Sequence, residues 1–404
     1  MPVAIARQSG RLAALFDDKS LPLGDPMPAP AFQASDATTV TLADGRVVVS
    51  FGGCNYLGLA SHPVVVEAVR AALDVFGLSA TASRETTGNA TPHETLEQEL
   101  AEFLQVERSL LVPDGYIANI AACQGLAGLG VSVALIDQRG HASLADAART
   151  AGLRVVRFDH ARPESVAGAV RASRPAAAVV MTDGVFTADG EIAPISGLLR
   201  EIGADDWLLV DDCHGLGTIG RGGRGSVAEA QLDDSRVVTT SSLAKGLGGA
   251  GGIVAGSDAF VAHCLRSSGY ICTTPIAPAM AEGTRAALRV LRSEPGMLDT
   301  LHANADRLRS GLGSLGLIPE SVRRTTPLAA FTVGDTPTME RLAADLLDDG
   351  FRVPLIRYPG GPAEAYFRLS VNAAHSAGQI DGLLRAFETR LPRQSRPATS
   401  AAFA

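Results

Sequence analysis

Seven short apolar runs, most of them separated by helix-forming segments, constrain the fold of this 404-residue chain more than any other feature. The runs are Ser109–Val112, Val133–Ile136, Arg154–Phe158, Ala177–Met181, Trp207–Asp211, Val237–Thr240 and Gly252–Ala255. Runs of this length are typical of strands that are buried on both faces of a parallel sheet. The intervening helices are expected over Tyr116–Ala127, Ser143–Ala151, Pro163–Ala172 and Pro194–Ile202. This alternation predicts an α/β fold with a mostly parallel sheet, helices on both faces, and ligand sites at the carboxyl ends of the strands.

The segments on either side of the alternation predict further parts of the chain. A chain of this length exceeds one typical domain. We expect an N-terminal arm over 1–45, a large domain over 46–285, a smaller α+β C-terminal domain over 286–390 and a disordered tail over 391–404. Prolines near their starts predict helices at about 62–76 and 92–105. A single long helix near 276–315 is expected to bridge the two domains.

Charge and cysteine content exclude several classes of protein. The formal net charge is −8, which argues against a nucleic-acid-binding surface. There is no charged-then-apolar signal pattern at the N-terminus and no apolar run of about 18 residues, so we expect no membrane span. The five cysteines form no C-x-x-C pair, which indicates reduced thiols in a cytoplasmic protein and no metal site.

Lysine is almost absent from the chain. Of the 35 basic residues, only Lys19 and Lys245 are lysines. Arginine can replace lysine as a generic positive charge, but only a lysine amine can form an imine or act as a nucleophile. Lys19 lies in a polar Asp-Asp-Lys-Ser stretch typical of a solvated surface, whereas Lys245 follows an apolar run and precedes glycines. Lys245 is therefore the candidate for covalent chemistry.

An aspartate accompanies this lysine. Asp211 ends the run Trp207–Asp211, where a buried carboxylate is costly unless it is paired. A protonated pyridine nitrogen would pair it. Asp212 is the poorer candidate, because consecutive side chains of a strand face opposite ways. Lys245 follows the next run, so adjacent parallel strands would place it beside Asp211. These are two of the groups that pyridoxal phosphate requires.

The other requirements of that cofactor are a phosphate cradle and a group that stacks on its ring. Gly115-Tyr116 follows the run Ser109–Val112 and opens a helix, whose first amides can bind phosphate. The hydroxyls of Ser241 and Ser242 are further phosphate candidates, and His141, after the run Val133–Ile136, can stack on the ring. Each feature alone is common at strand ends. Their order on successive strand ends favours a pyridoxal phosphate site.

A series of motifs extends from about residue 46 to 388. They are Asn55–Leu59, Ser83–His93, Gly115–Asn119, His141–Ser143, Gly184–Gly190, Asp211–His214, the Lys245 loop, Phe367–Ser370 and Ala373–His375. Through these motifs the chain resembles the α-oxoamine synthases, the family that includes serine palmitoyltransferase, 8-amino-7-oxononanoate synthase, glycine C-acetyltransferase and 5-aminolevulinate synthase. The resemblance implies the aminotransferase-like fold of the fold-type I pyridoxal-phosphate-dependent transferases.

The resemblance also implies roles for individual residues. Lys245 resembles the Schiff-base lysine that acts as acid and base, with Asp211, His141 and His214 as the other catalytic groups. The residues implied to bind the cofactor are Gly115, Tyr116, His141, Thr187, Asp211, His214, Ser242, Lys245 and Thr274. Thr274 corresponds to a residue contributed by a partner subunit, which implies a homodimer with shared active sites. Asn55 and Arg368 correspond to groups that hold the carboxylate of the amino acid.

The expected reaction is a decarboxylative Claisen-type condensation of a small α-amino acid with an acyl thioester, which gives an α-amino ketone. The sequence leaves open glycine, alanine or serine as the amino acid, and coenzyme A or a carrier protein as the acyl carrier. Transamination or retro-aldol cleavage on the same fold is the first alternative, and a catalytically inactive partner subunit is the second. The chain also departs from the family at three places: Asp114, where serine or threonine is common; Ser242, where threonine is usual; and Cys272–Pro278, where Pro275 and Ala277 change the pattern.

Overall fold

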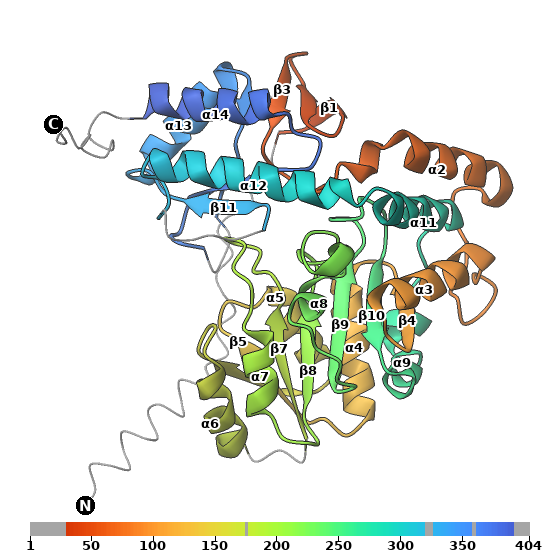
Figure 1. The fold of residues 1–404 in the computed structure, drawn as a ribbon. Helices are drawn as coiled ribbons and strands as arrows, with labels where there is room; N and C mark the ends of the chain where they lie inside the picture. The colour runs from red at the N-terminus through yellow and green to blue at the C-terminus, as the bar shows by residue number, and fades with distance from the viewer. Residues whose placement is uncertain (1–29, 174–176, 320–325, 358–360, 392–404) are drawn as a thin grey trace, which may run out of the picture.

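The computed structural model describes residues 30–173, 177–319, 326–357 and 361–391. Its centre is a seven-stranded sheet formed by all seven predicted runs (Figure 1). In spatial order the strands are β4 (Arg108–Val112), β10 (Gly252–Gly256), β9 (Val237–Ser242), β8 (Trp207–Asp211), β7 (Ala178–Asp183), β5 (Val133–Asp137) and β6 (Arg154–Phe158). The five strands from β9 to β6 are parallel, and β10 is antiparallel to both of its neighbours. The prediction of a mostly parallel sheet is confirmed.

Helices cover both faces of this sheet, because successive strand residues point to opposite faces and are apolar on each. On one face, Ala134 and Ile136 share a core with α4, α5 and α9. On the other, Val133 and Leu135 share a core with α6 and α7. The bounds of these helices are α4 (Gly115–Gly128), α5 (Ala142–Thr150), α6 (Pro163–Ser173), α7 (Ile195–Glu201) and α9 (Asp258–Cys264).

Three longer helices cover the β4–β10 side of the sheet. They are α2 (Pro63–Phe76), α3 (Thr91–Leu104) and α11 (Pro278–Ser293). The prediction of one long helix over 276–315 is wrong, since α11 ends at Ser293 and α12 (Gly296–Ser314) follows it. The cause is Pro295, which has no N–H to donate and disfavours helical geometry in the residue before it. Glu294 accordingly has φ −121° and ψ 66°, outside the helical region.

The C-terminal part of the chain forms its own core around α12. Its elements are β11 (Leu328–Phe331), α13 (Thr336–Asp348), β13 (Leu355–Ile356), β14 (Tyr366–Ser370) and α14 (Ala377–Arg390). Figure 1 shows α12, α13 and α14 gathered on one side of the large sheet, with the antiparallel β11-β14-β13 sheet beside them. The smaller C-terminal sheet that accompanies the large one in the predicted fold is therefore present.

Part of the predicted N-terminal arm pairs with this C-terminal region. A four-stranded sheet consists of β1 (Phe32–Ser35), β2 (Thr39–Leu42), β3 (Val47–Ser50) and β12 (Phe351–Arg352). The domain boundaries at 45, 285 and 390 stay predictions, and both the first 29 residues and the tail from 392 lie outside the described residues. The short elements are η1 (Leu59–Ser61), η2 (Arg221–Gly223), α8 (Ser226–Glu229) and α10 (Ser268–Ile271). Within the described ranges, no helix combines the length and the apolar character that a membrane crossing requires.

Candidate active site

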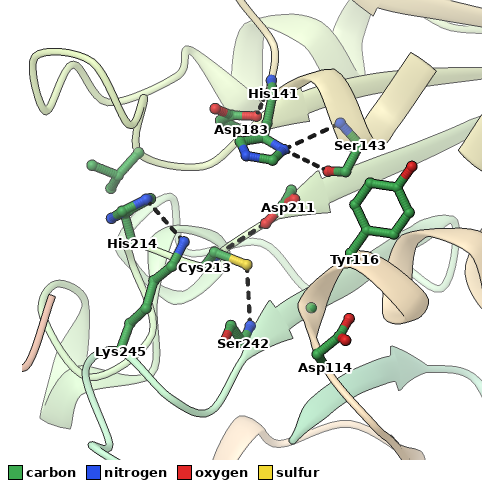
Figure 2. A pocket seen from close by; sticks show the side chains of 12 residues that line it. Asp114, Tyr116, His141, Ser143, Asp183, Asp211, Cys213, His214, Ser242 and Lys245 are labelled. Carbon is green, nitrogen blue, oxygen red and sulfur yellow. Dashed lines mark hydrogen bonds between the residues drawn. The ribbon is translucent and has the colours of Figure 1, made fainter. Parts of the chain in front are cut away.

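A cavity of about 230 Å³ lies at the carboxyl ends of the central strands (Figure 2). Its walls come from the segments that follow β4, β5, β7, β8 and β9. The lining residues are Asp114, Gly115, Tyr116, His141, Ser143, Asp183, Val185, Asp211, Cys213, His214, Ser242 and Lys245. The structure thus brings together seven of the residues selected from the sequence: Gly115, Tyr116, His141, Asp211, His214, Ser242 and Lys245.

Asp211 is the last residue of β8 and is only 5% exposed. One of its oxygens accepts a hydrogen bond from Asn119 Nδ2 at 2.7 Å, and the other accepts from the backbone N–H of Cys213 at 3.1 Å. Asn119, on α4, is itself fixed because its amide oxygen accepts from the Thr240 hydroxyl at 2.6 Å. These bonds hold the Asp211 carboxylate at the cavity wall. The sequence motifs included Asn119 but gave it no role.

The next residue, Asp212, faces away from the cavity. Its carboxylate accepts from the backbone N–H of Ser226 at 2.9 Å and from the Ser226 hydroxyl at 2.7 Å. Burial raises the pKa of Asp212 to about 6. The two adjacent aspartates therefore occupy opposite sides of the strand end, as the alternation of strand side chains requires.

A second buried carboxylate, Asp183, lies beside Asp211. The two residues are partners in the register of β7 and β8, and Asp183 Oδ1 accepts from the backbone N–H of His141 at 2.9 Å. Burial and the nearby charge of Asp211 raise the pKa of Asp183 well above its usual range. Sequence reasoning missed Asp183, although it follows an apolar run just as Asp211 does.

Lys245 lies across the cavity in contact with His214. The loop that follows β9 carries Lys245, and its Nζ is 3.0 Å from His214 Nε2. The other ring nitrogen of His214, Nδ1, is 2.6 Å from the Tyr56 hydroxyl. Burial, followed by the charges of Lys245 and Arg368, lowers the pKa of His214 well below its usual range. The imidazole is therefore neutral near pH 7. The sequence motifs included Tyr56 but gave it no role.

His141 is the N-cap residue of α5. Its backbone N–H is bonded to Asp183, and its Nδ1 accepts from the backbone N–H of Ser143 at 3.2 Å and lies 2.7 Å from the Ser143 hydroxyl. An Nδ1 that accepts from a backbone amide leaves the ring proton on Nε2. Burial lowers the pKa of His141, which favours the neutral ring. The bonds at Nδ1 fix a neutral imidazole in the cavity wall.

The first turn of α4 forms another part of the wall. A Cβ added at Gly115 would lie 3.0 Å from Ser242 Cβ and 3.1 Å from Cys213 Sγ, so only glycine leaves the space free. Asp114 caps this helix by accepting from the backbone N–H of Ile117 at 2.8 Å. The first amides of a helix have no partners within it and favour an anion. The Tyr116 hydroxyl, in contrast, donates to Asp146 at 3.0 Å.

Four residues selected from the sequence are not among those that line this cavity. Arg368, on β14, donates from Nε to the carbonyl oxygen of Thr187 at 2.6 Å, and its Nη2 is buried with no hydrogen-bond partner among the described residues. Asn55 accepts from the backbone N–H of Ala60 at 3.2 Å and lines a separate hollow of about 100 Å³. Thr274 is exposed on the single chain.

Comparisons with known proteins agree with this architecture. A family model described as aminotransferase class I and II matches residues 46–387. The 8-amino-7-oxononanoate synthase of Methylococcus capsulatus is 38% identical over 89% of this chain and 94% of the relative, and that of Thioalkalivibrio sulfidiphilus is 39% identical over 87% and 90%.

Solved structures give the same result. The serine palmitoyltransferase of Sphingomonas wittichii superposes with a TM-score of 0.83 at 28% identity, covering 98% of both chains. A serine palmitoyltransferase with pyridoxal phosphate as an internal aldimine superposes with a TM-score of 0.82 at 25% identity, covering 96% of both chains. The chain belongs to the aminotransferase class I and II family and, within it, to the α-oxoamine synthase group.

Proposed function

We propose that this protein is a pyridoxal-phosphate-dependent C-acyltransferase. It condenses a small α-amino acid with an acyl thioester, with loss of CO₂, to give an α-amino ketone. The observation that carries the proposal is the placement of the Lys245 amine and the Asp211 carboxylate on one cavity, at the ends of adjacent strands. The relatives at 38–39% identity support the product class, because their name describes an amine and a ketone on adjacent carbons.

The residues of the cavity fit the cofactor. A buried carboxylate such as Asp211 favours a cationic partner, which a protonated pyridine nitrogen provides. The neutral His141 ring offers a face for stacking. Gly115 lets Ser242 approach the start of α4 closely, so the first amides of α4 and the Ser242 hydroxyl lie on the same cavity and suit the phosphate. Asp114 also lines the cavity and its carboxylate could repel a phosphate, but its capping bond to Ile117 directs that carboxylate toward the helix.

When bound, the cofactor supplies an aldehyde for amines and a ring that takes up the electron pair released at the α-carbon. The Lys245 amine then acts as the base that removes the α-proton. Asp211 would keep the pyridine nitrogen of the cofactor protonated. His214 lies 3.0 Å from Lys245 and, as the family resemblance implies, would help to hold the cofactor. Arg368, with its free Nη2, holds the substrate carboxylate together with Asn55. The carbonyl oxygen of Thr187 accepts from Arg368 and so positions its guanidinium. The hydroxyl of Thr187 would bind the cofactor, as the family resemblance implies.

The proposal extends to the assembly and its surroundings. A homodimer with shared active sites would explain why Thr274 is exposed on one chain, because the partner subunit would receive it in its site. We propose a cytoplasmic enzyme whose substrates are an amino acid and an acyl thioester. The net charge of −8 would repel the phosphates of a nucleic acid, so we propose no nucleic-acid partner.

Replacing the lysine tests the proposal most directly. Lys245→Ala should lose at least about 10²–10⁴-fold in turnover, the range that a positioned general base contributes. Borohydride treatment of the cofactor-loaded wild-type protein should fix the cofactor on a peptide that contains Lys245, detected by mass spectrometry. Lys19→Ala is the matched control, since it removes the only other lysine, and it should retain both properties. The proposal would be contradicted if Lys245→Ala kept full turnover and borohydride still fixed the cofactor on it.

The acyl-transfer step needs a separate assay. Incubation with acyl-coenzyme A or an acyl-carrier protein and glycine, alanine or serine should release free thiol only when a suitable amino acid is present. Transamination and retro-aldol cleavage release no thiol from the acyl donor. Amino-acid turnover without thiol release, over a range of acyl chain lengths, would assign one of those reactions instead.

A further inference from the structure

Tyr56 is a buried phenol that the proposed reaction leaves without a role. It follows β3 in the segment Asn55–Leu59 and is 1% exposed. Its hydroxyl lies 2.6 Å from His214 Nδ1, and its ring is tilted against the imidazole with centroids 6.0 Å apart. On the opposite side of the imidazole, Nε2 is 3.0 Å from Lys245 Nζ. Tyr56, His214 and Lys245 therefore form a continuous chain of hydrogen bonds from a buried loop to the reactive amine.

The chemistry of the imidazole restricts this chain to two arrangements. A neutral imidazole has one N–H donor and one acceptor nitrogen, whereas a lysine ammonium can only donate. If the ammonium donates to Nε2 of His214, the ring proton is on Nδ1 and donates to the Tyr56 oxygen. If Nε2 carries the proton, Nδ1 must accept, and Tyr56 donates to it. A tyrosine hydroxyl can serve in both arrangements because it is both a donor and an acceptor.

The surroundings of His214 keep its ring neutral in both arrangements. The ionisable groups that face it are Lys245 from the loop after β9, Arg368 from β14 and His141 from the start of α5, and all three disfavour a second positive charge. Tyr56 stays a neutral phenol, because burial raises its pKa well above the usual value even though the charge of Arg368 opposes this. The neutral His214 ring therefore carries one proton, either on Nδ1 or on Nε2.

We propose that Tyr56 is a positioning residue that lets His214 exchange tautomers as Lys245 changes state. In the cofactor-free protein the Lys245 ammonium donates to Nε2, and the Nδ1 proton of His214 donates to the Tyr56 oxygen. Once Lys245 no longer presents an ammonium, the ring proton occupies Nε2, and the Tyr56 hydroxyl rotates to donate to Nδ1. The proton that Nε2 gains comes from the Lys245 ammonium, and the Nδ1 proton is released to bulk water, so the ring keeps one proton throughout.

The proposal distinguishes Tyr56 from a residue that merely fills space. Phenylalanine would preserve the packing of the ring but remove both the donor and the acceptor at Nδ1. In either tautomer, Nδ1 would then be buried without its partner, and a buried group without a partner is costly. The ammonium of Lys245 would still hold the ring proton on Nδ1, but that proton would have no acceptor, and the Lys245–His214 bond would weaken.

The first test uses the cofactor-free protein and does not depend on the proposed function. Solid-state NMR of protein labelled with ¹⁵N at histidine separates protonated from unprotonated ring nitrogens, and His214→Gln identifies the signals of His214 among the 8 histidines. We expect the Nδ1–H tautomer in the wild-type protein. An Nε2–H tautomer there would overturn the proposal, and this measurement needs no variant at Tyr56.

The second test compares two tyrosine-to-phenylalanine variants. Tyr56→Phe should keep the Nδ1–H tautomer in the cofactor-free protein, because Lys245 still donates to Nε2, but its Nδ1 signal should shift, because the Nδ1 proton has lost its acceptor. Tyr366→Phe is the matched control, because Tyr366 is also buried but its hydroxyl has no hydrogen-bond partner among the described residues. The control should leave the His214 signals unchanged. Unchanged signals in a folded Tyr56→Phe protein would overturn the proposal, because Tyr56 would then not be the hydrogen-bond partner of Nδ1.

The last step rests on the proposed function, since it requires the cofactor. Titration with pyridoxal phosphate, followed by absorbance, should show that Tyr56→Phe binds it roughly 3- to 10-fold more weakly, the effect of one lost hydrogen bond. Tyr366→Phe should bind as the wild-type protein does. Equal affinity in the wild-type and Tyr56→Phe proteins would refute the link between tautomer and cofactor. Absence of binding to the wild-type protein would instead refute the proposed function, while the cofactor-free spectra would still decide the role of Tyr56.

Discussion

The strand-end wall of the cavity and the Arg368 region differ in how their buried charges are paired. In the wall, both oxygens of Asp211 accept hydrogen bonds, and His141 is fixed through its backbone and its Nδ1. In the Arg368 region, Nε is bonded to a carbonyl oxygen while Nη2 is buried without a partner among the described residues. A buried charge with an unused donor is costly unless a ligand completes it. The chain itself fixes the residues of the wall, whereas we propose that Arg368 binds an anion that comes from outside the chain.

Among the variants of the strand-end wall and the Arg368 region, we expect the largest loss of turnover when Asp211 is neutralised. Asp211→Asn removes the charge that would hold a protonated ring nitrogen, and its amide group would face at least one of the two donors that Asp211 now accepts from. We expect turnover to fall roughly 10²–10³-fold, comparable to the loss of a preorganised electrostatic contact. Steady-state kinetics with saturating cofactor measure this change.

Asp212→Asn is the control for that variant. It introduces the same amide one residue later, on the side of the strand that faces Ser226 and not the cavity. Its turnover should stay within about threefold of the wild-type value, as expected for a change outside the site. Equal losses in the two variants would mean that the charge facing the cavity has no special role.

Arg368→Lys tests the other side of the comparison. A lysine keeps the positive charge but lacks the planar fork that binds a carboxylate through two parallel bonds. We expect KM for the amino acid to rise about 10- to 100-fold, which corresponds to roughly 1.5–3 kcal/mol for charged hydrogen bonds. The affinity for pyridoxal phosphate should not change, because Arg368 is not among the residues that line the cavity.

Arg357→Lys provides the matched control, because Arg357 forms only an exposed ion pair with Glu340 at 3.2 Å. Exposed pairs contribute little, so its kinetics should equal those of the wild-type protein. If Arg368→Lys changes cofactor affinity and leaves KM for the amino acid unaltered, Arg368 belongs to the strand-end wall and the contrast between the two regions is wrong.

The same contrast explains what the sequence could predict. Asp211, His141, Gly115 and Lys245 follow apolar runs, and the carboxyl ends of parallel strands meet at one edge, so their convergence follows from the pattern. The structure confirms that convergence. Asp183 carried the same signal but lay beyond the end assigned to its run.

The contacts that cross between distant segments could not be predicted. The bond from Arg368 to the carbonyl oxygen of Thr187 joins residues 181 positions apart, and no local periodicity encodes it. Tyr56 reaches His214 across 158 positions in the same way. The break between α11 and α12, in contrast, could have been predicted from Pro295 and the polar residues before it. Local sequence patterns therefore predict the residues at the strand ends, whereas the contacts between distant segments depend on tertiary packing.

The smallest expected effect is on stability, and it sharpens the contrast between the two adjacent aspartates. Burial raises the pKa of Asp212 to about 6 in the folded protein, against 3.8 for a free carboxyl. Between these values the folded state binds more protons than the unfolded state, so the free energy of unfolding falls as pH rises. Above about pH 6 the folded protein carries the whole cost of the buried charge, on the order of 3 kcal/mol.

Asp212→Asn should remove this pH dependence. Its amide can still accept from the Ser226 N–H and donate to the Ser226 hydroxyl, so the fold is retained. Denaturant unfolding of both cofactor-free proteins should show the variant gaining stability relative to the wild-type protein as pH rises from 4 to 7, by on the order of 2–3 kcal/mol. Other titrating groups are common to both proteins and cancel in the difference. A difference that stays constant with pH would mean that the charge of Asp212 is compensated by its hydrogen bonds, and the outward-facing aspartate would then be as well paired as the one that faces the cavity.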